Sequence, residues 1–270
     1  MQITIKKCEN NTYKADVVIE KLKVVNAFNE ALEHEAKDIE IKGFRKGKAP
    51  IDVVKKNIDQ AKLRSHALNH ILSDAYSNIV KENKLKPIVY PRFNISEFED
   101  DKDLKFTVTI IEAPEIKLGD YKAEIAKIET KGKESPSVQQ IIDAVLKCSE
   151  VKVAAELITE ETDRMMSSLI DQLGRLGLTI DKYMESQSKT PQSLRDEYSK
   201  TAENNIKSDF LITEIAGEEG VIISDEEVEK TLSAIPDEAS KKALSSPDQK
   251  LYIKAVLLKN KTIQKLAEAK

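Results

Sequence analysis

The sequence predicts an α+β domain of four antiparallel strands and two helices, in the order β-β-α-α-β-β, followed by an all-α domain. Apolar and polar residues alternate at both ends of the first 113 residues, and apolar residues recur at helical spacing between these ends. From residue 138 onward only the helical spacing is found. Charged residues make up 33% of the 270 residues and aromatic residues 5%, which favours helices with charged outer faces over an all-β fold.

Each expected strand alternates apolar residues with polar ones, as half-buried antiparallel strands do. The strands cover, in order, residues 2–6, 13–20, 93–98 and 104–110. Asn10 and Asn11 favour a turn between the first two strands, and the acidic stretch 99–101 separates the last two.

Two helices are expected between the strand pairs, each with one apolar stripe. The stripe of the first comprises Val25, Phe28, Leu32 and Ile39. The second helix begins near Ile51 and ends before Pro87, because proline disrupts a helix. Its stripe comprises Leu63, Ala67, Ile71, Ala75 and Ile79. The apolar face of the four strands needs a cover, so we expect both helices to lie on it.

Composition and turn signals suggest the domain boundaries. They give a first domain over residues 1–113, a linker over 114–137 and a helical domain over 138–270. The linker starts at a proline and ends in a stretch rich in Lys, Gly, Ser and Pro. In the helical domain, Thr190 before Pro191, and Ser224 three residues before Glu227, are signals for helix starts.

The loop between the two expected helices reads Gly43-Phe44-Arg45-Lys46-Gly47-Lys48-Ala49-Pro50, with one aromatic ring and three cations. A Walker A loop is excluded, because it needs four residues between its glycines and Ser or Thr after the lysine. From Lys42 to Arg64 the chain has eight cations and two anions, which suits an anionic partner such as RNA or an acidic protein patch. An ordinary solvated basic turn is the alternative.

The octapeptide resembles the G-F-R-x-G-K-x-P signature of trigger factor, the bacterial chaperone that docks at the ribosomal exit tunnel. The expected order of elements in residues 1–113 is similar to that of its ribosome-binding domain. The resemblance implies a site for the large ribosomal subunit, in contact with ribosomal protein and rRNA, at Gly43, Phe44, Arg45, Lys46, Gly47 and Lys48. In that site Phe44 would fill a shallow pocket and Arg45 would pair with an acidic residue.

The helical domain resembles, more diffusely, the arm helices of the trigger factor chaperone domain. This implies a surface that holds nascent or unfolded polypeptides without ATP. Methionine-rich surfaces adapt to varied shapes. The candidate residues are therefore Met165, Met166, Leu169, Leu173, Tyr183 and Met184. The alternative is that these side chains fill the helical core.

Full-length trigger factors also contain a peptidyl-prolyl isomerase domain of the FKBP type, which we do not expect here. Residues 130–270 contain three tyrosines, one phenylalanine and no alternating strand, whereas a proline pocket needs several rings on a sheet. We therefore expect a shortened form of the family that is not an enzyme.

No catalytic residue, metal site or cofactor is expected. His66 and His70 share a helix face, but Ala67 stands where a metalloprotease needs glutamate, and no third ligand is near in the sequence. Cys8 and Cys148 follow no metal or disulfide spacing. The sequence shows neither a signal peptide nor an apolar run of membrane-spanning length, so a cytoplasmic protein is expected.

Two other functions compete with a ribosome-associated chaperone. One is an RNA-binding protein that uses the basic loop directly, which predicts tight binding to naked RNA without a need for Phe44. The other is an off-ribosome holdase or assembly chaperone. The sequence leaves open whether the free protein forms a homodimer.

Overall fold

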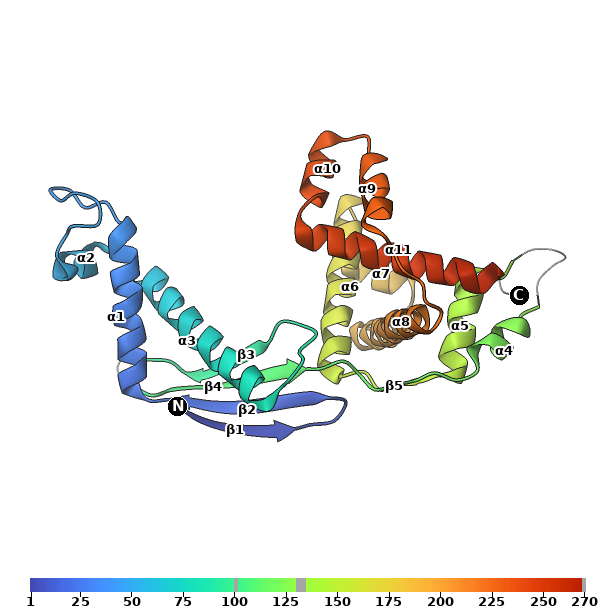
Figure 1. The fold of residues 1–270 in the computed structure, drawn as a ribbon, viewed down its shortest axis with the longest axis horizontal. Coiled ribbons are helices and arrows are strands. Elements are labelled where there is room, and N and C mark those ends of the chain that lie inside the picture. Colours follow the sequence, from blue (N-terminus) through green and yellow to red (C-terminus); the bar gives the residue numbers. More distant parts are fainter. Residues whose placement is uncertain (100–101, 130–134, 269–270) are drawn as a thin grey trace. The chain divides into compact units, whose positions relative to one another are not determined.

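The computed structural model describes residues 1–99, 102–129 and 135–268, and the chain divides into two compact units, Met1–Ala113 and Pro114–Lys270 (Figure 1). Each unit buries an apolar core of its own.

The first unit contains a four-stranded antiparallel sheet with the strand order β1-β2-β4-β3. Its strands are β1 (Gln2–Lys7), β2 (Thr12–Ile19), β3 (Arg92–Glu97) and β4 (Leu104–Ile111). Asn10 and Asn11 both have φ of 54°, so the turn between β1 and β2 uses the left-handed conformation that asparagine tolerates. The expected antiparallel sheet is therefore present.

Three helices, not two, separate the strand pairs: α1 (Lys21–Asp38), α2 (Ile51–Asn57) and α3 (Gln60–Asn83). The single second helix expected from Ile51 is interrupted at Ile58 and Asp59, so the predicted order is wrong by one helix. The Asp59 carboxylate accepts hydrogen bonds from the backbone N–H groups of Ala61 at 2.9 Å and Lys62 at 3.4 Å, and it thereby starts a new helix.

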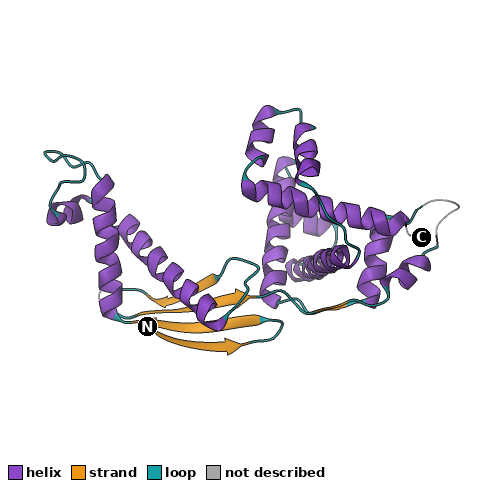
Figure 2. Ribbon diagram, viewed as in Figure 1, coloured by secondary structure: helices purple, strands orange, loops and turns teal. Residues whose placement is uncertain are grey.

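Helices α1 and α3 cover the same face of the sheet (Figure 2). The apolar stripe predicted for α3 is buried along its whole length. The stripe predicted for α1 is only partly right: Leu32 is buried as expected, but Val25 and Phe28 are only half-buried, and Val24, Ala27 and Ala31 are buried in addition. A smaller cluster joins the end of α1 to α2 and the start of α3; its buried members are Ala31, Leu32, Val54, Ile58, Leu63 and Ala67.

The second unit is mainly helical. Its helices are α4 (Tyr121–Ala126), α5 (Val138–Cys148), α6 (Ala155–Arg175), α7 (Ile180–Ser186), α8 (Pro191–Glu218), α9 (Asp225–Ser233), α10 (Glu238–Leu244) and α11 (Pro247–Glu268). The predicted starts at Thr190 and Ser224 are confirmed, since both residues form complete capping boxes. Side chains of α4, α5, α8 and α11 share one core.

A two-stranded ribbon is the feature of this unit that the sequence did not predict. Strand β5 (Ile116–Lys117) pairs with β6 (Glu150–Val151), so the expectation of helices alone from residue 138 onward is wrong at this point. Residues 114–126, expected as the start of a linker, lie in the second unit, where Tyr121 and Ile125 are buried. Residues 130–134 of the expected linker lie outside the described residues.

Candidate functional site

The loop between α1 and α2 is built from two consecutive tight turns. The backbone N–H of Phe44 donates to the carbonyl of Ile41 at 3.0 Å, and that of Lys48 donates to the carbonyl of Arg45 at 2.9 Å. Gly43 and Gly47 occupy the third position of each turn with φ of +93° and +73°. A type II turn requires positive φ at this position, which explains both glycines.

The loop is anchored at both ends. Ile41 and Ala49 are half-buried and pack on the small cluster between α1, α2 and α3. Gly47 also comes close to the last turn of α1, since a Cβ added there would lie 3.2 Å from the carbonyl oxygen of Lys37. The two turns are thus held by their flanks, and the residues between the anchors project outward.

All six residues predicted for ribosome binding are exposed. Phe44, at the junction of the two turns, is 43% exposed, so it is not buried in the protein's own core. Ile51, the first residue of α2, is exposed to the same extent, and no sequence pattern marks it as a surface residue. An aromatic ring and an aliphatic side chain therefore flank the loop cations at the surface.

The cations that continue from the loop along α2 and the start of α3 are exposed as well. One of them, Lys62, reaches across to α1 and pairs with Glu35 at 2.7 Å. The positive character of the segment from Lys42 to Arg64 therefore lies at the surface, where an anionic partner can reach it.

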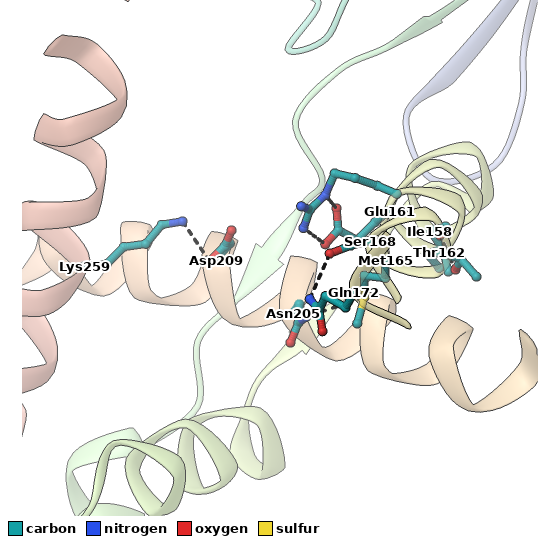
Figure 3. A network of polar contacts seen from close by, with 10 residues as sticks. Ile158, Glu161, Thr162, Met165, Ser168, Gln172, Asn205, Asp209 and Lys259 are labelled. Carbon is teal, nitrogen blue, oxygen red and sulfur yellow. Dashed lines mark hydrogen bonds and ion pairs between the residues drawn. The ribbon is translucent and has the colours of Figure 1, made fainter. Parts of the chain in front are cut away.

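The apolar residues in and around the predicted client site of the helical unit form an inner and an outer part. Leu173 is buried, and Met165, Met166, Leu169, Tyr183 and Met184 are half-buried. Met165 lies against α8, where the Asn205 amide donates to its sulfur at 4.0 Å (Figure 3). On the same stripe, Thr162 is buried and donates to the Ile158 carbonyl at 2.6 Å. This side of α6 faces its helical neighbour.

The outer part lies at the end of α6 and in the turn that leads to α7. Ile170, Leu176 and Leu178 are 50%, 74% and 45% exposed. None of these three was among the predicted site residues, although the position of Ile170 one residue after Leu169 places it off the buried stripe.

A second exposed apolar stretch lies on α11, where Leu251 and Tyr252 are each 66% exposed. Sequence reasoning missed both. The sequence does contain a sign of this exposure. Residues 251–258 include more apolar residues than one buried stripe of a helix can hold, so some of them must face outward.

The three histidines gather between α1 and α3. The rings of His34 and His66 meet edge to face with centroids 5.3 Å apart, and they line a cavity of about 150 Å³ together with His70. Within the part of the chain that the structure describes, no three His, Cys, Asp or Glu side chains are placed to hold a metal ion. Among those same residues, no helix has the length and apolar character to cross a membrane.

Two protein-family models match the chain. Residues 1–148 match the model described as "Bacterial trigger factor protein (TF)", and residues 119–268 match "Bacterial trigger factor protein (TF) C-terminus". The two matches overlap, so no isomerase domain lies between them.

Individual proteins similar to the chain are trigger factors as well. A trigger factor of Clostridium botulinum (strain Loch Maree / Type A3) is 29% identical over 161 residues, which are 60% of this chain and 36% of the relative. A trigger factor of Clostridium tetani is 33% identical over 127 residues, which are 47% of this chain and 30% of the relative. The matched part of the chain thus spans about a third of the length of these relatives.

The fold is similar to that of a solved structure described as "Promiscuous Substrate Recognition in Folding and Assembly Activities of the Trigger Factor Chaperone". The TM-score is 0.60, the identity is 15%, and the match covers 99% of both chains.

Proposed function

Because the chain belongs to the trigger factor family, we propose that it is a chaperone that docks beside the ribosomal exit tunnel through the 43–50 loop and holds nascent or unfolded polypeptides without ATP. The proposal includes a cytoplasmic location, since the ribosome is the docking partner. It assigns the ribosome contact to Gly43, Phe44, Arg45, Lys46, Gly47 and Lys48.

The exposed Phe44 ring is the observation that supports this proposal most strongly. Phe44 is 43% exposed between two glycine turns, so part of its apolar surface contacts water, and a pocket on a partner would bury that surface. Aromatic and arginine side chains are the residue types that most often dominate interfaces, at about 2 kcal/mol or more each. The neighbouring cations add an attraction to phosphate groups that weakens with salt.

The helical unit supplies the client surface in this proposal. The exposed outer part, Ile170, Leu176 and Leu178, together with half-buried Met166, offers apolar area next to flexible methionine. Met165 and Leu173, which face α8 or the interior, support this surface from within.

We further propose that the protein acts by binding alone. The family matches support this view. They overlap at residues 119–148, so no segment is left between them that could form an isomerase domain. A proline-containing test peptide should isomerise at the same rate with and without the protein, and an accelerated rate would contradict the proposal.

Sedimentation with purified ribosomes at physiological salt tests the docking. We expect the wild-type protein to pellet with ribosomes and the variant Phe44→Ala/Arg45→Ala to remain in the supernatant, with an unchanged circular dichroism spectrum. The control variant Tyr90→Ala/Arg175→Ala removes an exposed aromatic ring and an exposed arginine outside the loop, and it should pellet like the wild type. Undiminished pelleting of the loop variant would remove the docking proposal.

A further inference from the structure

The fold brings all three histidines of the chain to one small cavity between α1 and α3. His66 and His70 lie one helical turn apart on α3, and His34 comes from α1. In the sequence no third ligand lies near the α3 pair, and the packing of the two helices supplies one. The cavity is also lined by Ala27, Glu30 and Ala31. Since imidazole is the commonest metal ligand among side chains, this gathering points to a metal ion.

His34 and His66 already stand at the separation of two ligands on one ion. Their ring centroids are 5.3 Å apart, and the ring planes form an angle of 81°. With a zinc–nitrogen distance of about 2.0 Å and tetrahedral angles, the centroids of two ligating rings lie about 5 Å apart. One ion can therefore join α1 to α3 without a movement of either backbone.

A carboxylate faces the Nδ1 atom of each histidine on α3. Nδ1 of His66 lies 3.5 Å from Glu35, and it is buried without a hydrogen-bond partner among the described residues. Nδ1 of His70 lies 3.5 Å from Asp74. Metal-ligating histidines usually direct their other ring nitrogen to a carboxylate, which orients the ring. This arrangement leaves Nε2 of both rings as the metal ligand.

The third ligand has to come from a side chain that can turn. As the side chains stand, no three His, Cys, Asp or Glu residues in the described part of the chain meet at ligand distances. The His70 side chain is 56% exposed, so few neighbours oppose a rotation of its ring toward the other two histidines. Because this rotation has a cost, we expect an affinity on the order of micromolar, weaker than that of a preformed site with four protein ligands.

We propose that His34, His66 and His70 bind one zinc ion, with water at the fourth position. Imidazole nitrogen suits zinc, and zinc accepts a tetrahedral site with one open position. The ion would tie α1 to α3, and since it binds the folded chain it should raise the melting temperature. The site shares no residue with the proposed loop contact or the proposed client surface, so it can be tested independently of both.

Isothermal titration of the full chain with zinc chloride tests the proposal. The protein is prepared without a histidine tag and as Cys8→Ser/Cys148→Ser, because thiolates also bind zinc. We expect one zinc ion per chain. His34→Ala and His66→Ala should each weaken binding at least about tenfold, since loss of even an outer partner of a metal ligand costs about 10–100-fold.

A matched control and a folding check accompany these variants. Glu33→Ala/Asn69→Ala changes exposed residues of the same two helices, and it should bind zinc like the parent protein. In EDTA, the histidine variants should melt at the temperature of the parent protein, which shows that they fold. Zinc should raise the melting temperature of the parent and of the control, but not that of His34→Ala/His66→Ala.

Two further variants examine the remaining parts of the site. Glu35→Gln keeps the size of the side chain but removes its charge, so it should weaken zinc binding although Glu35 is not a ligand. With Co²⁺ in place of zinc, His70→Ala should change the visible absorption spectrum of the bound ion. Unchanged zinc affinity of His34→Ala would overturn the proposal, because the ion would then be held by α3 alone. An absence of zinc binding in a millimolar titration would overturn it as well.

Discussion

The phenol oxygen of Tyr121 on α4 lies 3.1 Å from a carboxylate oxygen of Glu219, at the end of α8. The same carboxylate pairs with Lys122 at 2.7 Å and with Lys265 of α11 at 2.9 Å. Burial of the ring, and then the hydrogen bond to Glu219, raise the pKa of Tyr121, so the phenol stays protonated and donates. One carboxylate thereby joins three helices of the second unit.

Tyr121→Phe removes this donor while it keeps the buried ring. Tyr121 is 4% exposed, so water cannot replace the lost bond fully, and we expect the free energy of unfolding to fall by about 1.5 kcal/mol. Urea denaturation followed by circular dichroism measures the change. Tyr252→Phe is the control, since Tyr252 is 66% exposed, and it should change stability by less than about 0.5 kcal/mol. Equal effects of the two substitutions would show that the Tyr121 hydroxyl makes no net contribution.

Acid should weaken the contacts through which Glu219 joins α4, α8 and α11. Hydrogen bonds from Lys122, Lys265 and Tyr121 lower the pKa of Glu219 from 4.5 to about 2. The folded state therefore binds this proton more weakly than the unfolded state, and the stabilisation is complete above pH 4.5 and lost as the pH falls toward 2. Melting temperatures between pH 2 and 7 should show a smaller acid-induced fall for Glu219→Gln than for the wild type. Glu226→Gln, at an exposed position of α9, should follow the wild-type curve.

Two glycines should respond to alanine in opposite directions. A Cβ at Gly119 would lie 1.9 Å from the carbonyl oxygen of Cys148, so Gly119→Ala forces the backbone beside the β5–β6 ribbon apart. We expect a loss of about 1–3 kcal/mol, the usual range for overpacking. A Cβ at Gly174 meets open space near the end of α6, and Gly174→Ala should stabilise by about 0.5–1 kcal/mol. A thermal melt in which Gly119→Ala is as stable as the wild type or more stable would contradict the close approach at Gly119.

The proposed client surface can be tested separately from the core that supports it. Ile170→Ser/Leu176→Ser removes exposed apolar area, so we expect weaker suppression of aggregation of an unfolded client, measured by light scattering, with stability within about 0.5 kcal/mol of the wild type. Leu173→Ala should instead lower stability by about 2–5 kcal/mol, because Leu173 is buried. Full suppression by the serine variant would place the client surface elsewhere.

The alternation of apolar and polar residues along each strand was enough to predict the sheet, because a sheet with one solvent-exposed face and one buried face has a period of two residues. The break before α3 could have been read from Asp59, whose short carboxylate is a common N-cap, but the continuous apolar spacing around it concealed the break. The β5–β6 ribbon could not be predicted, since two-residue strands carry no period and Ile116 pairs with Val151, 35 residues away. For the proposed sites, the sequence identified the exposed loop, whose role stays a prediction. The difference in exposure between Leu173 and Leu176 could not be predicted, because tertiary packing decides which neighbour covers each side chain.

The close approach of Gly47 to Lys37 has a kinetic consequence. Because both turns of the loop already hold their shape in the isolated protein, little chain entropy is lost when a partner binds. Capture should then be limited by diffusion and orientation rather than by a slow rearrangement of the loop. A β-branched residue in place of either loop glycine would disturb the preformed turn. We therefore expect its first effect to be slower association with the partner.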